Sequence, residues 1–423
     1  MLLIKDTLYL NSNNNFKIGT LVIEGQKIKS ISEDISDFDQ ENVSIINGSG
    51  FLVLPGLMNS HTHISMVLFR GFAEDLTLQD WLHNKILPLE LKLNQDLVFY
   101  GALMGIAELL HSGCTFFADM YFFMDAVAKA VSISGIRANL SLGLIDKNDQ
   151  SGLDQTKEFY NSFHGSAEER IQVFVGPHAP YTCNQDYLEK ISRLASDLKT
   201  GIHIHLNETE TEVNDYVHKH KTRPIVAMKN LGLFESPIIA AHCVHVNDEE
   251  IDILRRNNVL VVHNPSSNMK LASGISPVDK MLAHGVKISL GTDGAASNNQ
   301  LNLFKEMHMA SLLSKVSKKD ACSLPADAVF SMATETPANY FLGSHSGTIK
   351  EGNIADLILI DLEKANLFPH KSINKSIIHS IQGAEVHTVI INGKIIMQNH
   401  IIQTFDETET RNRANELLSG AFQ

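Results

Sequence analysis

Short apolar runs alternate with amphipathic segments through most of the chain. The segments between the runs, such as "NQDLVFYGALMGIAELLHSG" and "NQDYLEKISRLASDLKTG", place apolar residues at three- and four-residue steps and end near glycine, as helices do. Strand and helix alternating eight times predicts a closed parallel (β/α)8 barrel, with an open doubly wound sheet as the alternative. The eight runs are "GFLVLPGLM", "CTFFADM", "IRANLSLGLI", "IQVFVGPHAPY", "GIHIHLNET", "IIAAHCVH", "VLVVHNPSSN" and "VKISLGTDG".

The two chain ends have a different, strand-like pattern. Apolar and polar residues alternate in "LLIKDTLYL" and "GTLVIEGQKIKSI" near the start, and in "GTIKEGNIADLILIDL" and "VHTVIINGKIIM" near the end. An Asn-Gly pair at Asn392 and Gly393 is typical of a hairpin turn. We therefore predict an α/β protein of two domains. Residues 1–56 and 346–423 together form a small β-sandwich, and residues 57–345 form a TIM-like barrel.

The overall composition narrows the range of functions. Of the 423 residues, 43% are hydrophobic and 20% are charged, which is ordinary for a soluble globular protein. The formal net charge of −13 argues against binding to nucleic acid or to anionic lipid, because both depend on clustered Lys and Arg. No apolar run approaches the roughly 18 residues of a membrane span, and the start lacks the features of a signal peptide. The predicted location is therefore the cytoplasm. The four cysteines form no CxxC pair, so neither a disulfide framework nor a thiolate zinc site is indicated.

Polar residues recur where the predicted strands end, which is the rim where barrel enzymes carry their chemistry. Two of them, His61 and His63, are one residue apart, so on a strand they would share one face about 6 to 7 Å apart and could converge on a metal ion. Any single histidine can serve packing alone, but the whole set favours a site. Its members are His61, His63, Asp119, His178, His203, His205, His242, His245, His263 and Asp293.

The fifth and eighth runs supply further candidates. His203 and His205 repeat the one-residue spacing, and the outer His205 is the better ligand, while His203 is expected to fill a lower layer of the barrel. Glu208 lies an odd number of residues beyond His205, so it can face the site only if the strand has ended by then. Asp293, in "SLGTDGAASNN", could bind metal, accept a proton from bound water or cap the next helix. Three histidines and a carboxylate with one position left for water indicate a catalytic metal rather than a structural one.

An ordered set of longer motifs resembles the amidohydrolase superfamily, in its branch of 5-methylthioadenosine/S-adenosylhomocysteine deaminases, which is related to triazine hydrolases. The resemblance spans nearly the whole chain and rests on "PGLMNSHTHISMVLFRGFAEDLTLQDWL", "GPHAPYTC", "HLNET", "AAHCVH", "HNPSSNMKLASG" and "LGTDGAASNNQLNLF".

The resemblance implies one divalent ion, most simply Zn²⁺ although Fe²⁺ and Mn²⁺ accept similar donors, held by His61, His63, His205 and Asp293. It implies catalytic roles for three residues: His242 orients the water, Asp293 accepts its proton, and Glu208 moves protons to and from the ring. His178 is implied to hold the purine, together with Glu208, and Glu90 the ribose hydroxyls.

The implied reaction is hydrolysis of a 6-aminopurine nucleoside (5-methylthioadenosine, adenosine or S-adenosylhomocysteine) to its 6-oxo product with release of ammonia. The expected partner is this small-molecule nucleoside, with no nucleic acid and no membrane, and the chain could form a homo-oligomer. Two alternatives stay open, a triazine or other N-heterocycle hydrolase on the same scaffold and a non-catalytic binding protein.

The chain departs from the family where members that accept S-adenosylhomocysteine bind its carboxylate with arginines. Arg137 comes early, Leu142 stands where one arginine is expected, and no arginine lies near Gly152. An uncharged 5′ group is therefore the expected preference, unless Lys147 in the same loop substitutes.

Overall fold

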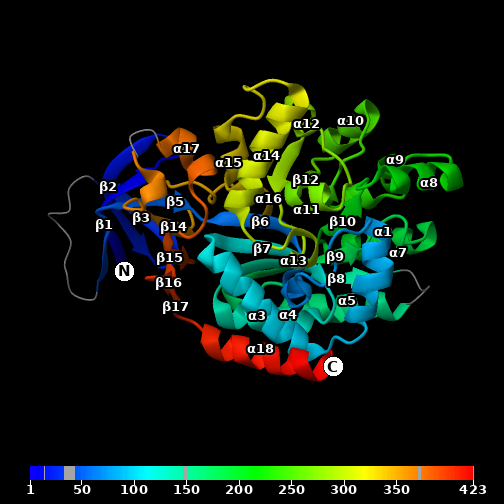
Figure 1. Ribbon diagram of the computed structural model, residues 1–423, viewed down its shortest axis with the longest axis horizontal. Coiled ribbons are helices and arrows are strands. Elements are labelled where there is room, and N and C mark those ends of the chain that lie inside the picture. Colours follow the sequence, from blue (N-terminus) through cyan, green and yellow to red (C-terminus); the bar gives the residue numbers. More distant parts are fainter. Residues whose placement is uncertain (14, 33–42, 146–149, 370–372, 423) are drawn as a thin grey trace.

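Eight parallel strands form the predicted barrel in the computed structural model, which describes residues 1–13, 15–32, 43–145, 150–369 and 373–422 (Figure 1). Their hydrogen-bonded order follows the sequence from β6 to β13. All eight predicted runs contribute one strand each. The strands are β6 (Leu57–Thr62), β7 (Cys114–Tyr121), β8 (Arg137–Leu144), β9 (Ile171–Pro177), β10 (Ile202–Leu206), β11 (Ile238–His242), β12 (Leu260–His263) and β13 (Lys287–Leu290).

The first and last barrel strands meet just beyond β13, which excludes an open doubly wound sheet. The Asp293 backbone N–H donates to the His61 carbonyl at 3.0 Å, and the Asn59 amide donates to the Thr292 hydroxyl at 2.7 Å. Gly291 makes this approach possible, since a Cβ there would lie 2.8 Å from the His61 carbonyl oxygen. The contact brings the end of the eighth strand beside the histidines of the first.

Helices surround the barrel and cover its outer face, as expected when parallel strands are buried on both sides (Figure 1). Among the described residues, no helix has the length and apolar character needed to span a membrane. The helices are α1 (Leu78–Asp80), α2 (Leu87–Glu90), α3 (Gln95–His111), α4 (Met124–Ser134), α5 (Gln150–Phe163), α6 (Ser166–Glu169), α7 (Gln185–Leu198), α8 (Glu210–His220), α9 (Pro224–Asn230), α10 (Asp248–Arg256), α11 (Pro265–Lys270), α12 (Val278–Ala283), α13 (Ala295–Asn298), α14 (Leu303–Lys318), α15 (Ala326–Ala333), α16 (Glu335–Phe341), α17 (Ile373–Ser380) and α18 (Glu407–Ala421).

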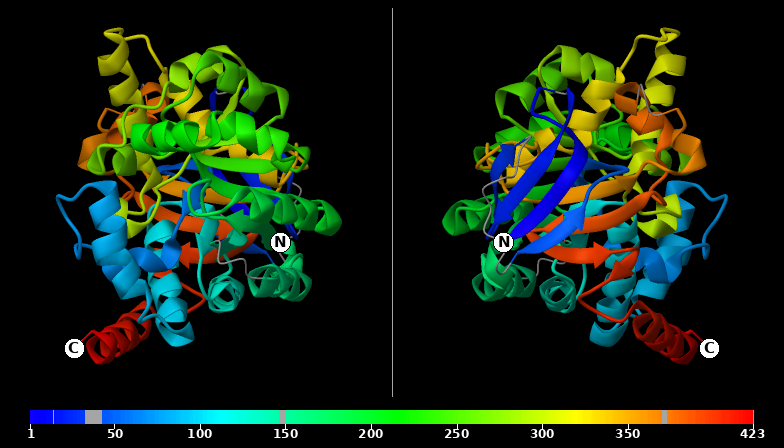
Figure 2. Two further views of the ribbon diagram at one scale, coloured as in Figure 1. Left: turned by 90° about the vertical axis from the view of Figure 1, so that its right-hand side faces the viewer. Right: turned by 90° about the vertical axis from the view of Figure 1, so that its left-hand side faces the viewer.

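Strands from both chain ends form one mixed sheet beside the barrel, and Figure 2 shows them lying side by side. β5 joins the two ends, because it pairs in parallel with β1 and antiparallel with β14. The association of the two ends is confirmed, whereas the boundaries at residues 56 and 346 stay a prediction. The strands are β1 (Leu2–Leu10), β2 (Phe16–Glu24), β3 (Lys27–Ser32), β4 (Ser44–Asn47), β5 (Phe51–Pro55), β14 (Leu357–Asp361), β15 (Val386–Ile391), β16 (Lys394–Gln398) and β17 (Ile401–Ile402).

A buried ion pair connects the terminal sheet to the barrel. Arg137, at the start of β8, donates to Asp356 and to Asn392, both at 2.6 Å. Its position at the amino end of the strand places it away from the rim that carries the candidate site. The C-terminal helix α18 makes a second connection, since His111 of α3 lies 2.8 Å from Glu407.

Candidate metal and catalytic site

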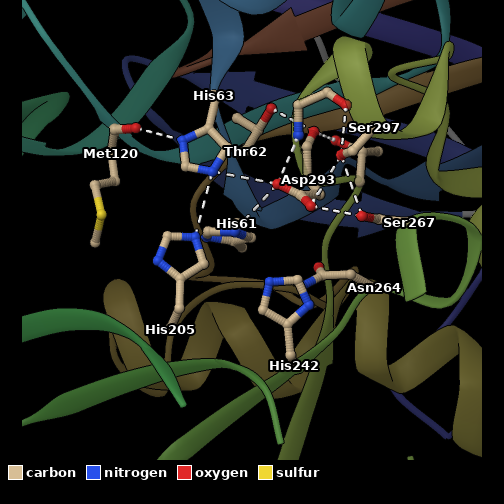
Figure 3. Close-up of polar contacts among 12 residues, drawn as sticks. His61, Thr62, His63, Met120, His205, His242, Asn264, Ser267, Asp293 and Ser297 are labelled. Atoms are coloured by element: carbon tan, nitrogen blue, oxygen red, sulfur yellow. Dashed lines mark hydrogen bonds and ion pairs between the residues drawn. The ribbon is translucent and has the colours of Figure 1, made fainter. Parts of the chain in front are cut away.

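Three imidazoles and one carboxylate converge at the carboxyl ends of the first, fifth and eighth barrel strands (Figure 3). The Nε2 atoms of His63 and His205 are 3.3 Å apart. Asp293 Oδ1 lies 3.2 Å from His63 Nε2 and 3.5 Å from His61 Nε2. These are the four residues that the sequence assigned to the metal. Three imidazoles and a carboxylate are the donor types that zinc and related divalent ions take in catalytic sites, so the residues present fit such an ion.

The other ring nitrogen of each histidine is bonded outside the cluster. His63 Nδ1 donates to the Met120 carbonyl at 2.5 Å, and His205 Nδ1 donates to the His178 carbonyl at 2.7 Å. His61 Nδ1 lies 2.8 Å from Nε2 of His203. Bonds of this kind fix ring orientation in metal sites, and here they leave every Nε2 directed at the centre.

Asp293 is held as an anion by several donors. Its Oδ1 accepts from the Gly294 N–H at 2.8 Å, and its Oδ2 accepts from the hydroxyls of Ser267 at 2.6 Å and Ser297 at 3.0 Å. Burial would raise the pKa of Asp293, but its contacts with His61 and His63 bring that pKa well below the usual range. The N-cap of the following helix α13 is Gly294, not Asp293. The carboxylate is therefore directed at the histidine cluster, and helix capping does not account for its position.

Burial determines the charge of two of the three clustered histidines, His61 and His205. It lowers the pKa of His61 to about 4 and that of His205 well below its usual value, so both rings are neutral, the form that binds metal. His63 differs: burial would lower its pKa, but contact with Asp293 outweighs this effect and raises the pKa to about 9.

Glu208 faces the cluster because strand β10 has ended before it. Asn207 takes a left-handed backbone conformation with φ of 52°, which changes the direction of the next side chain. Glu212 holds this turn, since its carboxylate accepts the N–H groups of Asn207 at 3.0 Å and Glu208 at 2.8 Å. The condition set by the sequence for Glu208 is thus met.

The Glu208 carboxyl pairs with an imidazole from the next strand. Its Oε2 lies 3.7 Å from His242 Nε2, and its Oε1 accepts from the Ser273 hydroxyl at 3.1 Å. Burial raises the pKa of Glu208, which favours the protonated acid. His242 Nδ1 bonds to Asn268 Oδ1 at 2.8 Å, so its Nε2 points at Glu208.

A cavity of about 210 Å³ opens over this cluster, and the remaining two predicted residues line it. His178 bonds through Nδ1 to the Thr182 hydroxyl at 3.0 Å, and burial lowers its pKa to about 4. Glu90 ends α2, directly after a π-helical turn, η2 (Trp81–Ile86). Burial raises the pKa of Glu90 to about 7, against the opposing effects of Tyr121 and His63.

Several of the polar residues that the sequence analysis placed at the rim of the barrel do not line the cavity. Asp119 accepts the Ile64 N–H at 2.7 Å and so braces the segment after β6. His245 bonds to the Ser273 carbonyl at 2.6 Å, and His263 is buried. His203 fills the barrel interior beneath His61, as the sequence indicated.

The sequence assigned no role to the residues that support the site: Ser267, Asn268, Ser297 and Glu212. Three of them fall in quoted motifs, Ser267 and Asn268 in "HNPSSNMKLASG" and Ser297 in "LGTDGAASNNQLNLF", but the motifs alone assigned them no role. The role of each of these residues depends on which side chain it contacts in the folded protein. A sequence motif does not show those contacts.

The model of the amidohydrolase family matches residues 52–396. The chain belongs to the amidohydrolase family. Among curated relatives, a 5-methylthioadenosine/S-adenosylhomocysteine deaminase of Caldanaerobacter subterraneus is 46% identical to this amidohydrolase over 407 residues, which is 94% of each chain. A 5′-deoxyadenosine deaminase of Methanobrevibacter smithii is 44% identical over 425 residues, covering 99% of this chain and 97% of its own.

Solved structures share the fold of this chain. An adenosine deaminase of Xanthomonas campestris with bound zinc superposes with a TM-score of 0.93 at 29% identity, over 99% of this chain and 98% of its own. A zinc complex of the atrazine chlorohydrolase of Arthrobacter aurescens gives 0.91 at 21% identity, over 99% and 100%, and at that identity it shows the fold alone. The donor set of this amidohydrolase supports a divalent metal site.

Removing one imidazole should abolish tight metal binding. We expect His205→Ala to weaken zinc binding by more than about tenfold, because it deletes a donor held in place by its Nδ1 bond. Metal content per chain after dialysis, measured by inductively coupled plasma mass spectrometry, checks this. His218→Ala on the exposed face of α8 is the control and should keep the wild-type content. Equal zinc in both variants would remove His205 from the ligand set.

Proposed function

We propose that this amidohydrolase removes the 6-amino group of an adenosine-type nucleoside by hydrolysis, giving the 6-oxo nucleoside and ammonia. The observation that carries the proposal is the buried acid Glu208, 3.7 Å from His242, in the same cavity as His63, His205 and Asp293. The deaminase names of the curated relatives support it. The donor set and the zinc-bound neighbours make zinc the proposed ion, held by His61, His63, His205 and Asp293.

When bound, the divalent ion lowers the pKa of water towards neutrality. Side chains of the protein then accept and donate the protons of the reaction. Asp293 is an anion at the centre of the cluster, so it accepts a proton as the water oxygen bonds to C6 of the purine. His242 donates from Nδ1 to Asn268 Oδ1, so its Nε2 accepts from the attacking water and holds it on the correct face of the ring.

Glu208 supplies the second proton transfer. Its raised pKa lets it hold a proton and give it to N1 of the ring as C6 becomes tetrahedral. The proton taken up by Asp293 then passes to the departing amino group. The C6–N bond breaks and ammonia leaves. The remaining C6 hydroxyl then gives its proton to the Glu208 carboxylate, which restores the acid and leaves the oxygen as the 6-oxo group. His178 and Glu90 are proposed to hold the purine and the ribose hydroxyls.

Ammonia release with mass spectrometry of the product tests this function. Zinc-loaded protein should convert adenosine, 5′-deoxyadenosine or 5-methylthioadenosine to the 6-oxo product, with a mass gain of about 1 Da as NH₂ becomes OH. Guanine and an aminotriazine belong in the same panel. Turnover of one of these and of no nucleoside would contradict the proposal and move the activity to another branch of the fold.

Glu208→Gln should separate chemistry from metal binding. The amide keeps the shape of the side chain but cannot deliver a proton to the ring, so we expect kcat to fall by about 100-fold or more with zinc content unchanged. Steady-state kinetics and metal analysis check both parts. Glu210→Gln, on the exposed first turn of α8, is the matched control and should keep wild-type kcat. If Glu208→Gln retained near-wild-type turnover, the proton-transfer role would be wrong.

The 5′ end of the nucleoside is proposed to point into a second cavity of about 1140 Å³. This cavity adjoins the first, since both are lined by Leu87, Glu90, Phe122 and Gly143. A nucleoside with C6 at the metal cluster and its ribose at Glu90 has its 5′ substituent at this junction. The second cavity therefore decides which 5′ groups fit.

The lining of the second cavity favours uncharged 5′ groups. Its walls are mostly apolar, with Leu142 and Phe159 among them, and the described lining residues include Glu158 but no Lys or Arg. Arg137, the one early arginine of this region, is engaged with Asp356 at the other end of β8. Lys147, the alternative cation named from the sequence, lies outside the described residues. A carboxylate placed here would lose water without gaining a Lys or Arg partner among the described lining residues.

We expect kcat/KM for 5-methylthioadenosine to exceed that for S-adenosylhomocysteine by about 10- to 100-fold, the cost of one poorly paired polar group. Leu142→Arg adds a cation to the wall of the second cavity and should raise kcat/KM for S-adenosylhomocysteine about tenfold. Leu142→Met, which adds no charge, is the control. Equal wild-type rates with both substrates would refute this preference and point to Lys147, to be tested by Lys147→Ala.

A further inference from the structure

We propose that His203 is a positioning residue that holds His61 in the one tautomer able to bind the metal through Nε2. The inference rests on the divalent metal site proposed above and assigns a role to a residue that the reaction itself does not use. Its basis is the hydrogen bond of 2.8 Å between His61 Nδ1 and His203 Nε2, inside the barrel. Both side chains are fully buried, with 0% of each exposed.

The proton positions follow from the ring chemistry. A neutral imidazole carries one N–H, and a ring that binds metal through Nε2 must carry it on Nδ1. The Nδ1–H of His61 then donates to Nε2 of His203. His203 therefore carries its own proton on Nδ1. The opposite arrangement would place a proton on His61 Nε2, at the centre of the cluster, and would block metal binding.

His203 differs in kind from the partners of the other two proposed ligands. His63 and His205 donate to backbone carbonyls, of Met120 and His178, which only accept. An imidazole accepts only in the tautomer that leaves its Nε2 unprotonated. The tautomer of one ring therefore determines the tautomer of the other. The orientation of His61 is set by the side chain of His203, which can be substituted.

Packing alone does not explain a histidine at this position. Buried aliphatic side chains fill the neighbouring strands of the barrel, such as Ile239, which pairs with His203 in the strand register. His203 Nδ1 has no hydrogen-bond partner among the described residues. A buried donor without a partner is unfavourable, so its retention indicates a gain elsewhere, and the bond to His61 provides that gain.

The test compares zinc affinity in His203→Leu, which has no acceptor, and His203→Gln, whose amide oxygen can accept from His61 Nδ1. Zinc dissociation constants come from competition with a chromogenic chelator, without nucleoside. We expect His203→Leu to bind zinc about 10- to 100-fold more weakly, as loss of such outer contacts does in metal sites. His203→Gln should recover most of the affinity. His263→Leu, which removes another buried barrel imidazole, is the control and should bind zinc as the wild type does.

Circular dichroism of the metal-free proteins establishes that each variant folds, and His203→Met replaces His203→Leu if the latter does not. Wild-type affinity in His203→Leu would overturn the proposal. So would an equal loss in His203→Gln, because that result assigns the effect to packing rather than to the acceptor. Since zinc is measured without substrate, tight wild-type binding with no deaminase activity would refute the proposed function and leave this inference intact.

Discussion

Closure of the barrel is the constraint on which the rest of the structure depends. The Asp293 N–H donates to the His61 carbonyl at 3.0 Å, and the Thr62 hydroxyl donates to the Asp293 carbonyl at 3.0 Å. These bonds join the first strand to the end of the eighth, so a carboxylate from late in the chain meets two imidazoles from its early part. An open sheet would leave them at opposite edges. The proposed metal site and the closed fold are therefore one feature, and weakening the closure should also disperse the ligands.

Two buried carboxyl groups lie in this site, and their surroundings push their pKa values in opposite directions. Burial would raise the pKa of Asp293, but its contacts with His61 and His63 bring that pKa well below its usual range. Glu208 has the Ser273 hydroxyl and a more distant His242, so burial dominates and its pKa rises. A hydrolytic deamination needs one carboxylate that accepts a proton and one carboxylic acid that donates one, and these two groups match those roles. The two imidazoles in contact with Asp293 create the difference, because Glu208 lacks partners as close as these.

The sequence predicts those parts of the site that follow strand periodicity. His61, His63 and His205 could be placed because alternate residues on a strand share a face. Glu208 could not be placed by the same rule, since its direction depends on the left-handed turn at Asn207 and on Glu212 holding that turn.

The fold was predictable to a similar depth. The alternation of apolar runs and helix-like segments predicted the barrel. The similar strand-like pattern at the two chain ends predicted that they associate. It did not give the pairing of β5 with both β1 and β14, because register between distant segments is set by packing. Nor did it show that Arg137 serves the junction with the terminal sheet, a role that only the position of Asp356 reveals.

The proposed chemistry and the proposed substrate preference are carried by different parts of the molecule. The reacting groups stand at strand ends and are fixed by backbone carbonyls, buried side chains and barrel closure, so few substitutions there leave the cluster intact. The second cavity is walled largely by helices and the segments that join them, including α5 and the end of β8. Side chains such as Leu142 can change there without moving a proposed ligand. Such separation agrees with the proposed function, in which the polar cluster determines the reaction and the cavity walls determine which 5′ group reaches it.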